Sequence, residues 1–484
     1  MDSKVVIGKY TLESLTNGMY TSPLDLYREY IQNAVDSFDT AIENGIDQLS
    51  RLYVDIYIDP DNRNITIMDN GCGVKADKVT SILLDIGNSQ KNRNFSRGFR
   101  GIGRLAGLGY CDRLLFRTSA EDEKVCTNIE FNGKMLRELL LPGNSESVSI
   151  DDVIERIVCT KVEAEAPKKR YFEVILENVT TEGGLLNLEL VKEYLVQHAP
   201  LPYADEFKWQ HTIVEKVRLA GYKIPQYKLF LNGEELSKAY RDSFISDRVK
   251  KNEDIIQDIK VEKFYRQNHL CAILWYAQSN FYGTILDNAI KGIRIRQGNI
   301  LLGDKSTCNA FFKEERFNGW LMGELHIVDQ ELIANSRRDG FEKNTAFYEM
   351  TALLKDWALG VSKEIRHISY ERSLSNTKRE VVEAESVDDV NDLCIEELDF
   401  DESLSEGSAF EQSESDEIAE IDYIGKLSML LNQKKHQTKY TALNINDRLT
   451  GEQRKVLERV FDLITQEYDR NQAEAFINTI AHKF

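Results

Sequence analysis

Three short groups of residues near the start of the chain carry side chains that could do chemistry. In the first group, Glu29, Asn33 and Asp36 follow one another at spacings of one helical turn, so they would share one face of a helix. A glutamate can act as a general base toward water, and the carbonyl oxygen of an asparagine is a ligand that suits Mg2+. This group therefore suits hydrolysis of a phosphoryl bond.

The second group is the run Asp69-Asn-Gly71-Cys-Gly73, which follows the alternating segment 64–68 of a predicted strand. A carboxylate at a strand end can accept a hydrogen bond from the exocyclic amine of a base such as adenine. Gly71 and Gly73 would let the backbone approach that base closely. Asn-Gly is also the commonest hairpin signal, but the second glycine and the lack of an immediate return strand argue against a hairpin.

The third group is the run Gly98-Phe-Arg100-Gly101-Ile102-Gly103, which is expected to open a helix after the polar stretch 88–97. Backbone amides at a glycine-rich helix start make an anion site. The glycine spacing also fits a dinucleotide fingerprint. That reading requires an apolar strand running into the first glycine, and the approach here is polar and charged. The basic approach, which includes Lys91, better suits a mobile lid that closes over phosphates.

The first group lies on a predicted amphipathic helix. Ser22-Pro23 supplies a cap and a first-turn proline, and apolar residues recur at helical spacing from Leu24 to Ile42. The polar face that holds Glu29 also holds Asp25, Arg28 and Gln32, so a purely solvated surface is the alternative interpretation of this face.

Together the three groups resemble the motifs of the GHKL ATPases, the superfamily of gyrase B, the ninety-kilodalton heat-shock chaperone, MutL, MORC proteins and sensor histidine kinases. The likeness is nearest to the chaperone-like and MORC-like branches. It implies a Bergerat-type α/β sandwich over residues 1–185 of an α+β chain, with ATP bound between the helices and a lid. It also implies that Glu29 is the general base, that Asn33 holds Mg2+ and that Asp69 reads adenine. The nucleotide-binding residues implied are Asn33, Asp36, Asp69, Gly71, Gly73, Lys91, Gly98, Arg100, Gly101, Ile102 and Gly103.

Two departures from the superfamily pattern stand out. The Gly-Thr pair that usually opens a late strand of the pocket is missing before the predicted strand 172–178, which leaves adenine specificity open. A histidine kinase needs a phosphoacceptor histidine upstream, and none of the residues before Glu29 is a histidine. ATP hydrolysis is therefore expected rather than phosphorelay.

Residues 186–345 resemble the middle, transducer domain of the chaperone and MutL branches. The segment 227–236 predicts a hairpin, the segment 270–277 a buried strand, and the segment 292–303 a half-buried strand that alternates apolar with basic residues. In those branches a basic residue reaches the γ-phosphate when the lid closes. Arg337 is the first choice for this sensor and Arg338 the second; ion pairs at the surface or between domains are the alternative role for both.

The acidic balance of the chain is concentrated in one segment. The formal net charge is −19, and residues 380–423 contain many acidic residues and no lysine or arginine. This composition predicts a disordered linker over 376–424. A helical extension is expected over 346–375, and a small helical module over 425–484, where an apolar stripe would suit pairing or docking.

These features predict a magnesium-dependent ATPase that works as a conformational clamp, slowly hydrolysing ATP and gated by lid closure and homodimerisation. A protein client or partner protein is expected. The alternatives are a MutL- or MORC-like DNA-associated clamp that works with a partner nuclease, and a switch module that binds ATP without hydrolysing it. Scattered cysteines and the lack of a signal peptide or membrane-spanning stretch favour a cytoplasmic protein without membrane contact.

Overall fold

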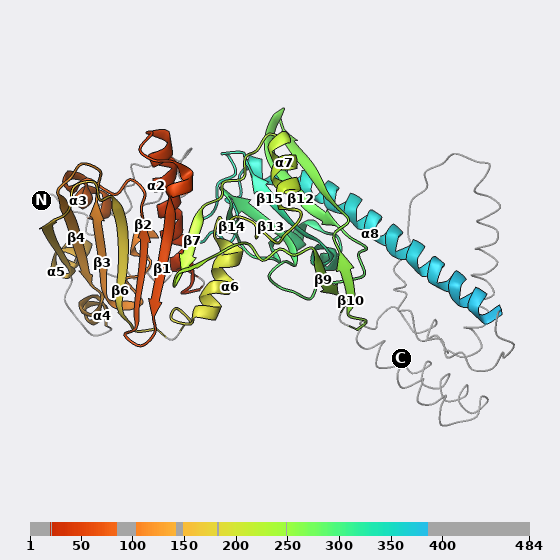
Figure 1. Cartoon of the computed structure of the whole chain (residues 1–484), viewed down its shortest axis with the longest axis horizontal. Helices are drawn as coiled ribbons and strands as arrows, with labels where there is room; N and C mark the ends of the chain where they lie inside the picture. Colours follow the sequence, from red (N-terminus) through yellow and green to blue (C-terminus); the bar gives the residue numbers. More distant parts are fainter. Residues whose placement is uncertain are drawn as a thin grey trace, which may run out of the picture. The chain divides into compact units, whose positions relative to one another are not determined.

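The computed structural model describes residues 20, 22–84, 103–141, 149–181, 183–247 and 249–385, with side chains through residue 374. These residues form two parts that mix helices and strands, each built on its own β-sheet, and the parts follow one another along the chain (Figure 1). Within the described residues, no helix combines the length and the apolar character needed to cross a membrane. The expected linker over 376–424 and helical module over 425–484 lie outside the described residues, except that helix α8 runs through residues 376–385.

The first sheet has eight strands in the order β5-β4-β3-β6-β2-β1-β7-β8. All neighbouring strands in it are antiparallel except β1 and β7, which are parallel. The strands are β1 (Tyr53–Asp59), β2 (Asn64–Asp69), β3 (Cys111–Ser119), β4 (Val125–Asn132), β5 (Val158–Ala164), β6 (Tyr171–Val179), β7 (Lys228–Leu231) and β8 (Glu234–Glu235). The mixed α/β class expected for the first domain is thereby confirmed, and strands β2 and β6 form where the sequence predicts them.

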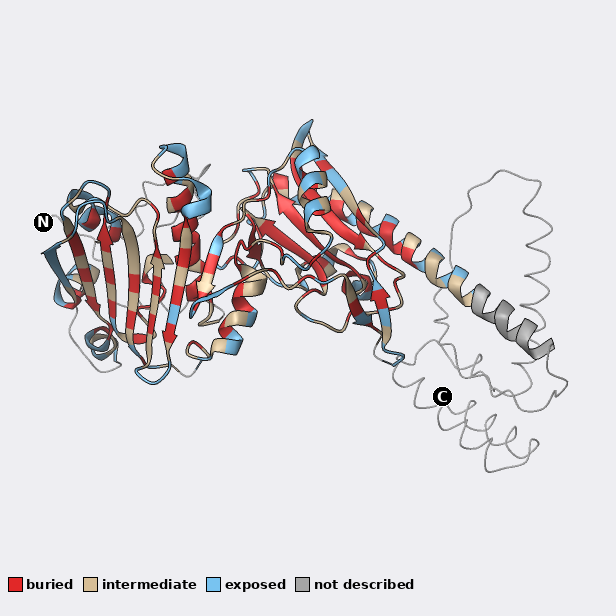
Figure 2. Cartoon of the chain, viewed as in Figure 1, coloured by how far each residue is buried: buried red, intermediate tan, exposed pale blue. Residues whose placement is uncertain are grey.

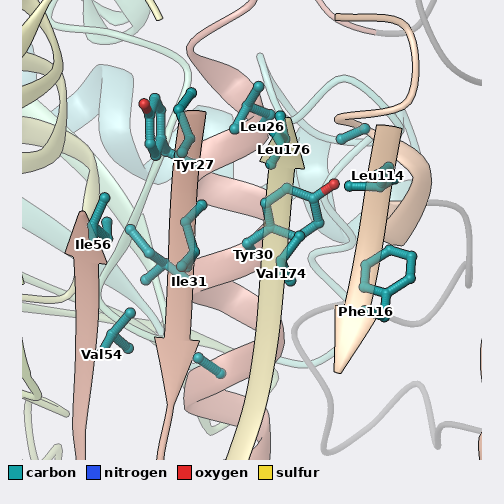
Figure 3. Close-up of a cluster of buried hydrophobic side chains, with 14 of the residues drawn as sticks. Leu26, Tyr27, Tyr30, Ile31, Val54, Ile56, Leu114, Phe116, Val174 and Leu176 are labelled. Atoms are coloured by element: carbon teal, nitrogen blue, oxygen red, sulfur yellow. The ribbon is translucent and has the colours of Figure 1, made fainter. Parts of the chain in front are cut away.

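Helix α2 (Asp25–Glu43) packs lengthwise against the first sheet. Figure 3 shows Tyr27, Tyr30 and Ile31 of this helix beside apolar side chains from strands β1, β3 and β6. These side chains are at most 3% exposed, and full burial of a large apolar side chain stabilises a fold by about 1.5–3 kcal/mol. The other helices of this layer are α3 (Ala76–Leu84), α4 (Gly133–Leu140), α5 (Ile150–Ile157) and α6 (Leu188–His198).

The first sheet continues past residue 185, where the sequence analysis placed a domain boundary. Strand β7 pairs with β1, and the turn at Asn232-Gly233 returns the chain into β8. Both turn residues have positive φ, 47° and 84°, as a two-residue hairpin requires. The hairpin predicted over 227–236 is therefore confirmed, and it belongs to the first sheet because its strand β7 completes the edge beside β1.

The second sheet has five strands in the order β11-β12-β15-β13-β14. They are β11 (Asp258–Arg266), β12 (His269–Gln278), β13 (Gly292–Gln297), β14 (Ile300–Leu302) and β15 (Met322–Ile327). The small hairpin of β9 (Ser243–Ser246) and β10 (Asn252–Ile255), helix α7 (Gln210–Leu219) and helix α8 (Thr345–Glu385) complete this part. Figure 2 shows the central strands β12, β13 and β15 buried along their length.

The prediction of a half-buried strand over 292–303 is wrong. Every residue of β13 up to Arg296 is buried, and Arg294 and Arg296 are each only 1% exposed. The alternation of apolar and basic residues led to this error, because it normally marks a strand with one face in water. Here the basic face is covered, and its charges are satisfied inside the protein.

Candidate functional site

Helix α2 presents the predicted catalytic group beside the glycine-rich segment. Glu29 is largely covered, and a Cβ atom placed on Gly103 would overlap with its Oε2 atom. A larger residue at position 103 would require the carboxylate of Glu29 to move. The structure therefore brings Glu29 and Gly103 together, although they are 74 positions apart in the chain. Asn33 and Asp36 lie further along the same helix, Asn33 partly exposed and Asp36 8% exposed.

The polar face of α2 is buried rather than solvated. Asp25 and Arg28 are each 5% exposed, and Gln32 is 1% exposed. Arg28 pairs with Asp25 at 3.2 Å and with Glu29 Oε1 at 3.6 Å, and Tyr194 of helix α6 donates its hydroxyl hydrogen to Asp25 at 2.9 Å. The alternative interpretation, a polar surface that faces solvent, is excluded because these side chains are buried. Buried charges require partners, and the contacts above supply them.

Arg28 stays protonated in this environment. Burial alone would lower the pKa of its guanidinium group, but the neighbouring Tyr194, Glu29 and Asp25 raise that pKa above its ordinary value. A permanent positive charge therefore lies beside Glu29.

The glycine-rich segment does not open the helix that the sequence predicts. The described part forms a single 3-10 turn, Gly103–Leu105, and the chain enters β3 at Cys111. Glycines at 103, 107 and 109 weaken a helix. The hydroxyl of Tyr30 replaces the missing helix bonds, accepting from Gly107 N at 2.9 Å and donating to Arg104 O at 3.2 Å.

Tyr30 is a positioning residue that the sequence analysis missed. Its ring is 3% exposed and lies between β6 and β3, with its hydroxyl group directed toward the side of Leu114 (Figure 3). Burial raises the pKa of this phenol, so the hydroxyl keeps the proton that it donates to Arg104 O. A buried tyrosine needs a partner for its hydroxyl, and this rule could have linked the residue next to Glu29 with a distant segment.

The loop after β2 has the shape expected for close approach to a flat ligand. Asp69 is 5% exposed, and its Oδ1 atom accepts a hydrogen bond from Gly71 N at 2.9 Å. A Cβ atom on Gly71 would overlap with the hydroxyl of Ser37, and one on Gly73 with the carbonyl of Ser119. Gly73 also has a φ of 63°, which favours glycine. No hairpin strand follows, and the next described element is α3, as the sequence analysis expected.

Two residues fix this loop and were not singled out from the sequence. Ser37 of α2 accepts from Cys72 N at 2.9 Å through its hydroxyl group. Arg170 donates from Nε to Gly71 O at 2.8 Å and forms an ion pair with Asp47. Arg170 stands just before β6, the strand before which the sequence analysis noted that the expected Gly-Thr pair is missing. The position therefore supports the loop backbone with a guanidinium group.

The thiol of Cys72 lies inside the same loop. Burial raises its pKa above the ordinary value, and the thiol donates to Ser37 O at 3.3 Å. It is therefore a protonated, weakly nucleophilic side chain whose small size suits the turn.

Several predicted nucleotide contacts lie outside the described residues. They are Lys91, Gly98, Arg100, Gly101 and Ile102. The described part of the site comprises Glu29, Asn33, Asp36, Asp69, Gly71, Gly73 and Gly103, and it is drawn from helix α2, the loop after β2 and the start of the glycine-rich turn. The roles assigned to these residues stay predictions.

The donor set fits a magnesium nucleotide. Among the described residues no group of three histidine, cysteine, aspartate or glutamate side chains could hold a metal ion. Mg2+ in nucleotide sites takes one or two protein oxygens and completes its shell with phosphate and water. The carbonyl oxygen of Asn33 would be such a protein ligand, and the bound ion would neutralise charge on the phosphates.

The predicted sensor Arg337 lies on a loop that touches helix α2. Arg28 Nη2 donates to the main-chain oxygen of Arg337 at 3.3 Å, and the side chain of Arg337 is exposed. Arg338, the second choice, is 9% exposed and has a φ of 56°. The structure thus places the loop of the second sheet next to the residue that also pairs with Glu29.

One buried carboxylate on the second sheet is surrounded by basic side chains of this part. Glu324 of β15 is fully buried and receives Lys238 Nζ at 2.8 Å, Tyr203 OH at 2.9 Å and the guanidinium group of Arg296. Burial favours the neutral acid, but Arg296 and Lys238 outweigh it and hold the pKa of Glu324 well below its usual range. Burial and Arg296 lower the pKa of Lys238 to about 7.

These contacts also tie the second sheet to helix α6. Arg296 Nη2 donates to Gln197 O at 2.9 Å, and Arg294 Nη2 donates to the side chain of Gln197 at 3.2 Å. Arg294, Arg296, Arg337 and Arg338 are the basic residues here that could line a surface groove for nucleic acid. Three of the four are buried, and only Arg337 is exposed, so they do not form such a groove.

Comparison with known proteins defines the class of the first domain. Residues 26–151 match the family described as Histidine kinase-, DNA gyrase B-, and HSP90-like ATPase. This match to a GHKL-type ATPase family supports the resemblance drawn from the three groups of residues. The match covers helix α2, the loop after β2 and the glycine-rich turn. No curated protein matches the chain.

Proposed function

We propose that the chain is a magnesium-dependent ATPase of the chaperone-like GHKL type, which hydrolyses ATP slowly and works as a dimeric clamp on a protein client. In this proposal Glu29 activates water, Asn33 holds Mg2+ and Asp69 recognises the base, with Asp36 in support. Gly101, Gly103 and the basic lid residues Lys91 and Arg100 enclose the phosphates. Arg337 reaches the terminal phosphate when the lid closes.

One observation carries this proposal. Arg28 bonds simultaneously to the predicted base Glu29 and to the main chain at residue 337, so the candidate hydrolytic group and the candidate sensor share a neighbour. The glycine-rich turn passes the same carboxylate at Gly103. Three segments that a nucleotide switch must couple therefore converge at one end of helix α2.

The arrangement also supports slow turnover. The guanidinium group of Arg28 lies 3.6 Å from Glu29 Oε1 and holds this carboxylate in place. A shift of Arg337 toward phosphate would alter the loop whose carbonyl Arg28 binds, and would change how Arg28 is shared between the loop and Glu29. Loop movement would then set the position of the Glu29 carboxylate, and conformational change rather than chemistry would limit the rate.

The same contact favours one alternative, a switch module that binds ATP without hydrolysing it, if Arg28 never releases Glu29. The DNA-associated clamp keeps less support, because three of the four basic residues that could line a nucleic-acid groove, Arg294, Arg296 and Arg338, are buried. Strong dependence of DNA binding on salt would favour that clamp, since phosphate contacts release counterions.

The proposal is tested by ATP turnover and ATP affinity with Mg2+ in the wild type, Glu29→Gln and Arg337→Ala. Glu43→Gln, at the exposed end of the same helix, is the matched control. We expect Glu29→Gln to bind ATP and lose turnover by about a hundredfold or more, because a general base contributes 10²–10⁴-fold. Arg337→Ala should lower turnover with unchanged affinity. Binding without turnover in the wild type would establish the switch module, and absence of ATP binding would refute the proposal.

A further inference from the structure

Strand β5 is an open edge of the first sheet with an unusual degree of exposure. It is the terminal strand in the sheet order, and among the described residues no strand pairs with its outer side. Six of its seven residues are exposed, on both faces of the sheet, and Val162 at its centre is 60% exposed. A regular edge of this length with an apolar centre is a template for pairing with another strand.

The register with β4 shows which backbone groups of β5 face outward. Glu165 N donates to Lys124 O at 2.8 Å, in line with the β4–β5 pairing, so the odd-numbered residues of β5 turn their amides and carbonyls toward β4. In an antiparallel ladder these directions alternate along the strand. Thr160, Val162 and Ala164 therefore direct their N–H and C=O groups away from the sheet.

We propose that β5 pairs antiparallel with β5 of a second copy of this chain, around a two-fold axis at Val162. In this register Val162 faces Val162 of the second copy, and Thr160 faces Ala164, so outward amides meet outward carbonyls. Lys161 then lies opposite Glu163 of the second copy, and Glu163 opposite its Lys161. The pairing joins two first sheets into one continuous sheet and covers the exposed Val162 side chain.

Charge complementarity selects this register and this occupant. A two-fold axis at Lys161 would set lysine against lysine, and an axis at Glu163 would set glutamate against glutamate; like charges directly opposite destabilise a sheet. Registers centred between residues would place outward groups against inward ones. The sequence Thr-Lys-Val-Glu-Ala is self-complementary only about its central valine, which favours a second copy over an unrelated strand.

This interface uses none of the residues proposed to bind or hydrolyse ATP, so it is tested on the full chain without nucleotide. Sedimentation equilibrium gives the dimer dissociation constant for the wild type, Lys161→Glu, Glu163→Lys and the double exchange. Each single reversal turns two attractive cross-strand pairs into two repulsive ones. We expect each to weaken association about tenfold or more, and the double exchange to restore it to within about twofold.

Glu235→Lys at the opposite edge of the sheet is the matched control, because Glu235 is exposed on β8 and lies far from β5 in the strand order. It should leave the dissociation constant unchanged. Circular dichroism melting would verify that every variant is folded, which the exposure of these side chains predicts.

A disulfide trap reads the register directly. Residues 161 and 163 of opposing copies would form a non-hydrogen-bonded pair with Cα atoms about 4.5 Å apart, within disulfide range. Lys161→Cys combined with Glu163→Cys should give a covalent dimer on mild oxidation, with the 161–163 linkage identified by peptide mass spectrometry. Association unaffected by both single reversals, or a trap that yields no more covalent dimer than the wild type, would overturn the proposal.

Discussion

The substitution Tyr30→Phe tests how the glycine-rich turn is held for nucleotide. It removes one oxygen atom from a buried ring and leaves the ring packing between β6 and β3 intact. The hydroxyl accepts from Gly107 N and donates to Arg104 O, so both bonds are lost together. The phenyl ring of the variant offers no replacement hydrogen-bond partner for these two backbone groups.

The magnitude follows from these two bonds. An intramolecular hydrogen bond contributes about 0.5–1.5 kcal/mol net, and a buried donor left unsatisfied costs about 1–3 kcal/mol. We expect the free energy of unfolding of the first domain to fall by roughly 2 kcal/mol. If the turn must be rebuilt when ATP binds, about 1–2 kcal/mol of that loss reappears in binding, which weakens ATP affinity by roughly 5–30-fold.

Tyr27→Phe is the matched control. Tyr27 is equally buried on the same helix, and its hydroxyl donates to Leu185 O at 2.7 Å, away from the glycine-rich turn. Urea unfolding and calorimetric titration with ATP should show a loss of stability in both variants and a loss of affinity only in Tyr30→Phe. Wild-type affinity in Tyr30→Phe, or an equal affinity loss in Tyr27→Phe, would refute the argument.

Three further predictions concern stability and the loop after β2. Burial lowers the pKa of His198 to about 4, whereas an unfolded imidazole titrates near 6.5; the unfolded chain therefore takes up the proton first as pH falls, and stability should decline between these values by roughly 3 kcal/mol. Free energies of unfolding from urea titrations at pH 7.5 and 5 should show about 2 kcal/mol of this decline, and His198→Phe should reduce it. Glu324→Gln should lower stability by about 3–5 kcal/mol, seen in thermal unfolding, because it leaves buried cations without their carboxylate; an unchanged transition would contradict this. Gly73→Ala should abolish ATP binding, since its Cβ would overlap with a carbonyl, whereas Gly45→Ala, at a similar φ of 66° but in open space, should cost only about 1 kcal/mol and bind ATP normally.

The elements that rest on local patterns could be predicted from the sequence. Helix α2 forms where apolar residues recur at helical spacing, and β2 where they alternate. The turn at Asn232-Gly233 follows from residues that tolerate positive φ. The three groups that suggested a nucleotide site also gave the correct class for residues 26–151, because each combines rare residue types at fixed spacing.

The features that depend on distant residues could not be predicted. The burial of Arg294 and Arg296 depends on Glu324 and on helix α6, and the local pattern resembled a half-exposed strand. The conformation of the glycine-rich segment depends on its hydrogen bonds to the distant Tyr30 hydroxyl, and local helix propensity does not reveal these bonds. Likewise, β7 joins the first sheet because it can pair in parallel with the edge of β1. The local sequence around residue 228 carries no information about that distant edge.

The bond from Arg28 to residue 337 is made to the main chain, and this has a consequence for how the protein can evolve. A peptide carbonyl is present whatever side chain residue 337 carries, so the loop keeps its place against helix α2 while that side chain changes. Substitutions at 337 can therefore change the side chain on this loop and keep its main-chain contact with helix α2. The backbone of residue 337 keeps the contact with helix α2, and the side chain at this position is left to vary under selection.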